Sequence, residues 1–133
     1  SSDLKQSFIR SVLRRALSDM LLGKTVDIRI DRPLGSHHPK HTDMIYPVNY
    51  GYVPHIFSAD GEEVDVYLLG VSQPVEKYKG RVIAVIHRLD DVEDKWIAAP
   101  TGVTFTPDEI EKAVNFQEQY FRHEIEIYKA DEV

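Results

Sequence analysis

Apolar residues at the start of the chain recur with the spacing of a helix. Between residues 3 and 22 they lie mostly three or four positions apart, at Leu4, Phe8, Ile9, Val12, Leu13, Ala16, Leu17, Met20 and Leu21. Gly23 follows directly and is a common helix-stopping residue. We therefore predict one amphipathic helix over residues 3–22. Its apolar stripe is expected to pack on its own domain or on a second subunit, in preference to a membrane surface.

The period then shortens to that of β-strands. Residues 25–31 alternate strictly, with Val26, Ile28 and Ile30 on one face and charged residues on the other. Residues 32–43 hold two prolines, a glycine and three histidines, which is typical of a loop. Short strands separated by turn residues are also predicted at residues 45–53, 64–69, 81–88 and 95–99.

A second helix is predicted near the end of the chain. Thr106 can cap it, Pro107 suits its first position and Glu109 completes a capping box. Apolar residues continue the helical pattern to about residue 122, at Ile110, Ala113, Val114 and Phe121. Residues 124–128 alternate, so they fit either a short strand or an extension of the helix.

These elements predict a single domain over residues 1–133 that is mainly β with flanking helices. About five short strands suit a small closed or nearly closed barrel, which would occupy residues 25–100. The helices at 3–22 and 106–122 would flank it. A sheet covered by helices on one side is the alternative architecture.

Composition and charge exclude or disfavour several classes of function and partner. Hydrophobic residues make up 42% and charged residues 29% of the chain, as in an ordinary globular domain. The formal net charge of −6 disfavours nucleic acid as a partner, but divalent cations can turn an acidic pocket into a phosphate site. The absence of cysteine excludes disulfides and thiolate catalysis. Without a membrane span or a signal-peptide pattern, we expect a cytoplasmic protein with no membrane partner.

Three of the four carboxylates in the segment Asp60-Gly-Glu-Glu-Val-Asp65 are expected to lie close together, namely Asp60, Glu62 and Asp65. Gly61 permits a tight turn that carries Asp60 and Glu62, and Asp65 projects from the strand that follows. Magnesium prefers hard oxygen ligands of this kind. Taken by itself, however, such a segment is more often a solvated acidic turn.

A second acidic segment precedes Lys95. It contains four carboxylates, at Asp90, Asp91, Glu93 and Asp94. A charged hairpin is again the simpler interpretation of this segment alone. If both acidic segments lie at the same end of one barrel, their mutual repulsion would cost stability unless cations bind there.

The segment Tyr46-Pro-Val-Asn-Tyr50-Gly-Tyr52-Val-Pro54 places three phenols at positions of one parity. Its two prolines restrict this strand to an edge, a bulge or its ends. Phenol hydroxyls can donate to phosphate oxygens without adding charge, and core packing is the equally weighted alternative for each of them.

Taken together, and in their chain order of Tyr46–Pro54, Asp60–Asp65 and the acidic segment before Lys95, these three segments resemble the soluble family I inorganic pyrophosphatases. The similarity runs from about Val26 to Pro100, and a weaker similarity is present in the last predicted helix. The resemblance implies an OB-like five-stranded barrel with flanking helices. It also implies hydrolysis of pyrophosphate to two phosphates with several magnesium ions, for which manganese is a possible substitute.

The resemblance also assigns roles to individual residues. The metal ligands would be Asp31, Asp60, Asp65, Asp90 and Glu93. Asp94 is the alternative to Glu93. The general base would be Glu62, where the family has an aspartate, and the phosphate-site residues would be Tyr50, Lys95 and Tyr120. A glutamate in place of an aspartate lengthens the arm by one methylene, and a shift of about 1 Å can cost ~100-fold in rate.

Three cationic phosphate contacts of the family lack clear counterparts in this chain. His38 lies near the position of an arginine, Lys40 is a substitute candidate for a lysine, and Arg122 stands next to the position of another lysine. Each lost contact is worth roughly 1.5–3 kcal/mol if nothing replaces it. A different diphosphate substrate and a binding or regulatory module without turnover are therefore the alternatives. The N-terminal apolar stripe favours a homo-oligomer in each case.

Overall fold

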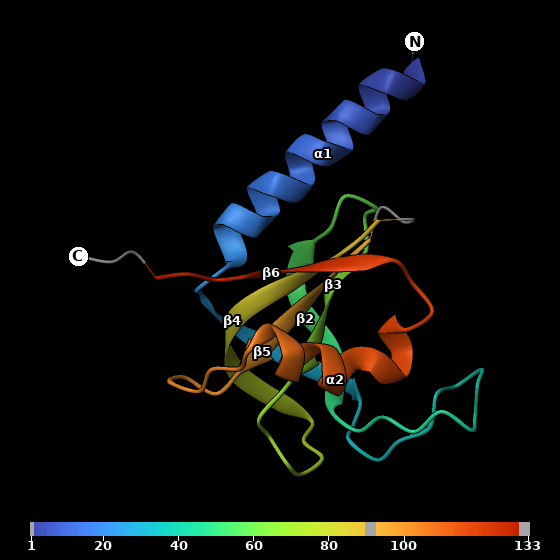
Figure 1. The fold of residues 1–133 in the computed structure, drawn as a ribbon, viewed down its shortest axis with the longest axis vertical. Coiled ribbons are helices and arrows are strands. Elements are labelled where there is room, and N and C mark those ends of the chain that lie inside the picture. Colours follow the sequence, from blue (N-terminus) through green and yellow to red (C-terminus); the bar gives the residue numbers. More distant parts are fainter. Residues whose placement is uncertain (1, 90–92, 131–133) are drawn as a thin grey trace.

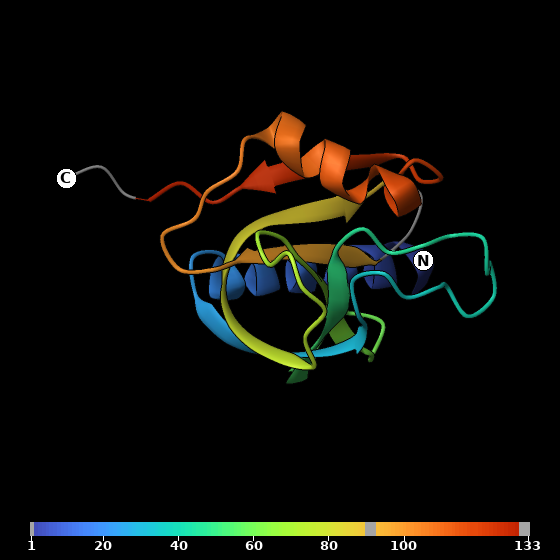
Figure 2. The same cartoon turned by 90° about the horizontal axis from the view of Figure 1, so that it is seen from below.

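The computed structural model describes residues 2–89 and 93–130, which form two helices and six strands (Figure 1). In chain order these are α1 (Ser2–Leu21), β1 (Thr25–Arg32), β2 (Asn49–Phe57), β3 (Glu63–Leu68), β4 (Lys77–Arg88), β5 (Asp94–Ala99), α2 (Pro107–Glu118) and β6 (His123–Ile127). Viewed from below, the barrel has α2 and β6 together on one side (Figure 2).

Strand β1 closes the barrel because it pairs with two strands at once. Its first part pairs antiparallel with β4, from Thr25 opposite Arg81 to Arg29 opposite Lys77, and its second part pairs with β2. Strand β2 pairs with β3, β3 runs parallel to β5, and β5 returns to β4. The predicted five-stranded barrel is confirmed, and β6 is an additional strand on β4.

The close approach of β1 to β2 explains the glycine between Tyr50 and Tyr52. A Cβ atom at Gly51 would lie 1.8 Å from the carbonyl oxygen of Arg29 and 2.8 Å from the Cα of Ile30. Any larger residue would push β1 away from β2, because backbone atoms cannot yield as a flexible side chain can. Gly51 is therefore required by the barrel itself.

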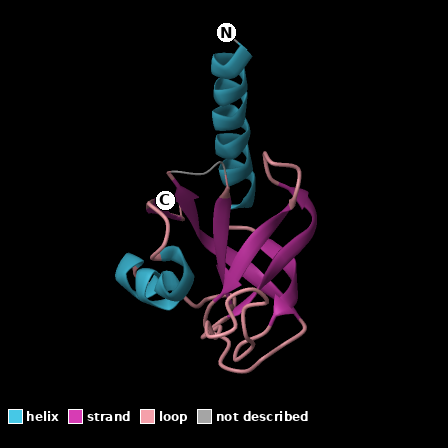
Figure 3. Ribbon diagram, turned by 90° about the vertical axis from the view of Figure 1, so that its right-hand side faces the viewer, coloured by secondary structure: helices cyan, strands magenta, loops and turns pink. Residues whose placement is uncertain are grey.

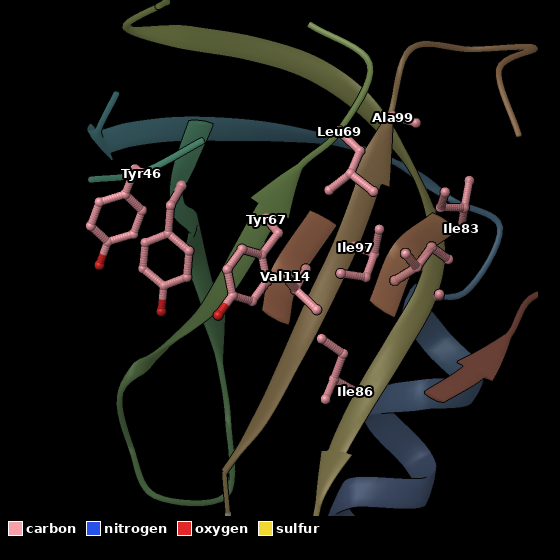
Figure 4. Close-up of a cluster of buried hydrophobic side chains, with 11 residues drawn as sticks. Tyr46, Tyr67, Leu69, Ile83, Ile86, Ile97, Ala99 and Val114 are labelled. Atoms are coloured by element: carbon pink, nitrogen blue, oxygen red, sulfur yellow. The ribbon is translucent and has the colours of Figure 1, made fainter. Parts of the chain in front are cut away.

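Two hydrophobic cores lie on opposite faces of the barrel wall. The first fills the barrel interior and includes Ile28, Val66, Val85 and Trp96, with Leu21 of α1 packed among them. The second lies between the wall and α2 (Figure 4) and contains Tyr46, Tyr50, Tyr67, Ile86, Ile97, Ile110 and Val114. Alternation along the strands assigns most successive side chains to the two cores in turn. The exception is in β4, where a register shift after Val82 places both Ile83 and Ala84 in the second core.

Helix α2 begins as predicted and ends earlier. Thr106 Oγ1 accepts the backbone N–H of Glu109 at 3.2 Å, and Glu109 accepts the backbone N–H of Thr106 at 2.9 Å, which completes the capping box. The helix ends at Glu118 rather than near residue 122, because the chain must turn there to place β6 on β4. The alternating residues 124–128 therefore lie mainly in a strand.

Two strand boundaries also differ from the sequence pattern. Strand β2 begins at Asn49 rather than residue 45, and residues 33–48 form a loop in which Ile45 makes one isolated bridge to His37. Pro47, which has no N–H to donate, lies in this loop. Strand β4 begins at Lys77 rather than residue 81, because its first residues pair with β1.

Helix α1 projects away from the barrel (Figures 1 and 3). Only its last turns pack on the barrel, where Ser18 and Leu21 are buried and Leu17 contacts the interior core. Its first half is exposed, and Phe8 retains 70% of its surface. Within the described residues, neither helix combines the length and apolar content needed to cross a membrane.

Candidate functional site

A cavity of about 840 Å³ lies beside the C-terminal end of α2. Residues from β1 to β5, from the loop 33–48 and from the end of α2 line it. Its charged residues are Asp31, Arg32, Asp43, Asp65, Arg88 and Lys95. Segments far apart in the sequence thus contribute to one chemically mixed site.

Lys95 is the centre of the charged residues in this cavity. Its side chain is buried, and Nζ donates to Asp65 at 2.5 Å, to Glu93 at 2.6 Å and to the Tyr50 hydroxyl at 3.0 Å. Burial alone would lower the pKa of Lys95, but Tyr50, Asp65 and Glu93 outweigh it and raise that pKa. Lys95 is therefore a permanent cation held between two carboxylates and a phenol.

Asp65 and Glu93 form a pair of neighbouring carboxylates. Burial raises the pKa of Glu93, and its interaction with Asp65 raises it further, whereas Lys95 opposes both effects. Lys95 offsets only part of the repulsion between the two carboxylates, so a second cation would reduce what remains. Carboxylate oxygens are the donors that magnesium and manganese prefer, so the chemistry of this pair fits such an ion.

The metal-ligand set predicted from the sequence is only partly brought together. Asp31 and Asp65 line the cavity and Glu93 lies against Lys95, but Asp90 falls outside the described residues. Among the residues that the structure does describe, no three histidine, aspartate or glutamate side chains are grouped so that they would hold a metal. Among the described residues of the predicted ligand set, Asp65 and Glu93 are thus the two that share the contact with Lys95.

Asp60 and Glu62 lie on the turn between β2 and β3 and are exposed. Asp60 accepts hydrogen bonds from the Ser58 hydroxyl and from the backbone N–H of Glu62. Neither residue lines the cavity. Because β3 and β5 are parallel, this turn nevertheless lies at the same end of the barrel as Glu93.

The neighbours Glu93 and Asp94 face different partners. Glu93 contacts Lys95, whereas Asp94 accepts two hydrogen bonds from Nε of Arg14 on α1, at 3.1 and 3.2 Å, and lies 3.1 Å from Nδ1 of His87. Arg14 and His87 lower the pKa of Asp94 against the opposing effect of burial. Glu93 thus contacts the cation of the cavity, whereas Asp94 fastens α1 to the barrel.

Sequence reasoning missed two arginines in this site. Arg32 donates to the Tyr46 hydroxyl at 2.5 Å and lies over the Tyr46 and Tyr50 rings. Arg88 makes two hydrogen bonds to Glu118, at 3.0 and 2.7 Å, and its guanidinium lies 3.6 Å from the centre of the Phe121 ring. The only signal for Arg32 was its place next to Asp31, and nothing local connects Arg88 with Glu118.

The four predicted substrate contacts divide into two groups. His38 and Tyr120 line the cavity, whereas Lys40 and Arg122 are exposed and do not. Nδ1 of His38 accepts the backbone N–H groups of Lys40 and His41, at 3.0 and 3.1 Å, which leaves the proton on Nε2. Burial and the nearby Arg32 lower the pKa of His38, so the ring is a neutral donor.

The comparisons with known proteins point to one family. The family described as Pyrophosphatase: Inorganic pyrophosphatase matches residues 23–130, which leaves α1 outside the match. An inorganic pyrophosphatase of Rickettsia conorii is 34% identical over 96 residues, covering 66% of this chain and 56% of the relative. One of Haemophilus ducreyi is 38% identical over 104 residues, covering 69% and 57%. The chain thus spans about half the length of these relatives.

Solved structures agree on the fold. The crystal structure of an inorganic pyrophosphatase from Ehrlichia chaffeensis superimposes with a TM-score of 0.63 at 20% identity, covering 80% of this chain and 88% of that one. A structure from Coxiella burnetii gives a TM-score of 0.59 at 16% identity, covering 81% and 87%. At these identities the likeness shows the fold alone.

Proposed function

The chain belongs to the inorganic pyrophosphatase family, and we propose that it hydrolyses inorganic pyrophosphate to two phosphates with magnesium as its cofactor. The observation that carries this proposal is the contact of Lys95 with Asp65, Glu93 and Tyr50 at one cavity. It combines a fixed cation for phosphate oxygens with a carboxylate pair suited to a divalent ion.

Asp65 and Glu93 are the residues that would hold the metal, with Asp31, which lines the same cavity, and Asp60 as further candidates. Asp90 is a further candidate in the segment outside the described residues. When bound, the ion would neutralise phosphoryl charge and lower the pKa of the attacking water. Manganese offers the same preference for carboxylate oxygens and is the alternative cofactor.

The chain's own residues would supply the remaining chemistry. Lys95 and Arg32 would offset charge on the phosphoryl oxygens, and the Tyr50 hydroxyl would orient Lys95. Glu62 would take the proton of the attacking water from its position on the exposed turn. His38 and Tyr120 would contact the substrate from the cavity wall, and Lys40 and Arg122 would act from outside it.

The decisive assay measures phosphate release from pyrophosphate by the whole chain. We expect turnover that depends on magnesium and is partly supported by manganese. The absence of phosphate release with magnesium, manganese and cobalt in turn would overturn the proposal.

A catalytically impaired binding or regulatory module is the second candidate. It is favoured by the exposure of Asp60 and Glu62, because the predicted metal ligand Asp60 and the predicted general base Glu62 do not line the cavity. Tight binding of magnesium and pyrophosphate in calorimetry, without any phosphate release, would select this function.

We also propose a cytoplasmic location and a small-molecule diphosphate, rather than nucleic acid or a membrane, as the partner. The formal net charge of −6 supports the choice of partner, because nucleic-acid and anionic membrane surfaces would repel the chain.

A further inference from the structure

Helix α1 exposes its apolar side. Only its last turns pack on the barrel, through Leu17, Ser18 and Leu21, and its first half projects into solvent (Figures 1 and 3). Val12 precedes the buried Leu21 by about two and a half helical turns, so it lies on the opposite side of the helix. Together with Val12, the exposed apolar residues around it form what we call the outer face: Leu4, Phe8, Ile9, Leu13, Ala16 and Met20.

The contacts that hold α1 on the barrel do not use the outer face. Arg14 donates to Asp94 at the start of β5, and Arg15 donates two hydrogen bonds at 2.8 Å to Glu126 of β6. Exposed apolar residues gathered on one face of a helix are typical of a binding surface. Helix α1 also lies outside residues 23–130 that match the family, so this surface belongs to the chain's own N-terminal segment.

The outer face is complementary to itself. Lys5 and Asp19 each lie about two helical turns from Val12, in opposite directions, and so share its side of the helix. Phe8 and Ala16 are likewise equally far from Val12. In two helices that pack antiparallel about a two-fold axis at Val12, Lys5 of each copy comes to the level of Asp19 of the other. The large Phe8 comes to the level of the small Ala16, and each contact forms twice.

Asp19 already has a neighbour within its own helix. Nε of Arg15 lies 3.6 Å from Oδ1 of Asp19, which is longer than a hydrogen bond, and the two side chains are 55% and 72% exposed. Nη2 of Arg15 is engaged by Glu126 instead. A carboxylate accepts from several donors, so the ammonium of Lys5 from a second copy can approach Asp19 while the contact with Arg15 persists.

The result is a row of alternating charges across the two copies. It consists of Glu126, Arg15 and Asp19 of one copy and Lys5 of the other. Among the described residues, Lys5 has no ion-pair partner within its own chain. Because Arg15 offsets part of the charge of Asp19 and all these groups are near solvent, the charges fix the register of the pair more than its affinity.

A second copy fits the outer face better than an anionic membrane does. Helices that lie on such membranes use lysines and arginines beside their apolar face to reach the lipid headgroups. In α1, Arg14 is paired with Asp94 and Arg15 with Glu126. Asp19 also adds a carboxylate to the face itself, which anionic lipids would repel.

We infer that the outer face of α1 binds α1 of a second copy as an antiparallel helix pair, with Val12 at the two-fold axis. Helix α1 has 20 residues and is therefore about 30 Å long. Each helix joins its own barrel only through its last turns, so the two barrels lie at opposite ends of the pair. The apolar residues of both outer faces are then buried between the helices.

Sedimentation of the whole chain across a concentration series measures the association. We expect a dimer for the wild type, and Val12→Asp should raise the dissociation constant at least tenfold, because two carboxylates then meet at the two-fold axis. Ser7→Asp adds the same charge on the side of α1 that Leu21 occupies, and it should change the constant less than about threefold. Circular dichroism checks that both variants keep the helix. A wild-type monomer at all concentrations, or equal effects of the two variants, would overturn the inference.

Single cysteines test the antiparallel orientation, since the chain has none of its own. Val12→Cys brings two thiols together at the two-fold axis, whereas Leu4→Cys leaves its two thiols about 24 Å apart along the pair. Under the same treatment with diamide, we expect disulfide-linked dimers from Val12→Cys at least tenfold faster than from Leu4→Cys. Similar rates for the two variants would indicate parallel helices and contradict the proposed pairing.

A charge exchange tests the contact between Lys5 and Asp19. It is made in the Arg15→Gln background, because a lysine at position 19 would otherwise lie beside Arg15. In that background Lys5→Glu should raise the dissociation constant about threefold to tenfold, and Lys5→Glu/Asp19→Lys should return it to within about twofold. Arg10→Glu, on the side that Leu21 occupies, is the matched control for Lys5→Glu. A double variant that recovers nothing would refute the register about Val12.

Vesicles of phosphatidylcholine and phosphatidylserine test the other occupant of the outer face. We expect the wild-type chain to remain unbound in a flotation assay at concentrations where it is a dimer. A monomeric chain that floats with these vesicles, and no longer does so as Val12→Asp, would show that the outer face binds a membrane surface in place of a second copy.

Discussion

Lys95 and Asp65 are register partners in the parallel pair of β5 and β3, and the ammonium lies 2.5 Å from the carboxylate. This contact joins the two acidic segments of the sequence at one end of the barrel. It also fixes Lys95 in a buried position, where a cation without partners would be costly.

Replacement of Lys95 by methionine should reduce kcat/KM for pyrophosphate by about 100-fold or more. The reason is that a buried cation stabilises negative charge on the phosphoryl oxygens more strongly than an exposed cation does. Phosphate release at saturating magnesium measures the effect. Lys79→Met removes an exposed lysine of β4 and is the matched control. Retention of more than half of the wild-type activity by Lys95→Met would exclude a catalytic role.

Glu93→Gln and Asp94→Asn should have different effects, although the residues are adjacent. We expect Glu93→Gln to weaken magnesium activation at least tenfold, because it removes one charge of the metal-binding pair. Asp94→Asn should leave magnesium activation within about threefold and lower thermal stability, because it weakens the contact with Arg14. A magnesium titration of activity and a thermal melt separate the two effects. Loss of magnesium activation only in Asp94→Asn would reverse the assignment.

Glu118→Leu should destabilise the fold by about 3–5 kcal/mol, because it leaves the Arg88 guanidinium buried without its partner. The double variant Arg88→Met/Glu118→Leu should recover most of this loss, since it removes both charges together. Urea denaturation gives both free energies of unfolding. Equal destabilisation by the single and double variants would show that side-chain shape, rather than charge pairing, dominates at this position.

His87 should make the stability of the chain depend on pH. The hydrogen bond to Asp94 raises the pKa of His87 against burial, and Glu126 raises it further. Because the pKa is higher in the folded state, the stabilisation is complete below about pH 6.5 and is lost as the pH rises through the folded-state value.

We therefore expect His87→Gln to lose most stability relative to wild type at pH 6 and least at pH 8. The free energy of unfolding at both pH values measures this difference. His38→Gln is the control, because the pKa of His38 is lowered and its contribution has the opposite sign. A His87→Gln effect that grows from pH 6 to pH 8 would contradict the assignment.

Glu62→Gln should lower kcat for pyrophosphate by roughly 100-fold or more and leave the magnesium dissociation constant nearly unchanged, as expected for a general base that does not hold the metal. Glu62→Asp should retain more activity than Glu62→Gln, because it keeps the carboxylate. Activity and calorimetric magnesium binding are measured on the same preparations. A normal kcat for Glu62→Gln would move the base elsewhere in the site.

Much of the fold could be predicted from the sequence because its signals are local. The alternation at residues 25–31, the capping box at Thr106 and the turn at Gly61 each depend on neighbouring residues, and each element occurs close to its predicted place. The family resemblance is confirmed by the match over residues 23–130. The wrong predictions concern the ends of helices and strands. At the end of α2, for example, the pairing of the following strand β6 with β4 decides the boundary.

For the candidate site too, the sequence predicted what depends on local signals, and the structure decided what depends on distant contacts. The sequence alone indicated that the acidic segments and the Tyr50 strand belong to one site, and it named Asp65, Glu93 and Lys95, whose contact the structure shows. Only the tertiary structure decided that Glu93 faces Lys95 while Asp94 faces Arg14, that Arg32 and Arg88 enter the cavity, and that Asp60 and Glu62 stay on an exposed turn. These choices depend on contacts between residues far apart in the sequence, which local periodicity and charge pattern do not specify.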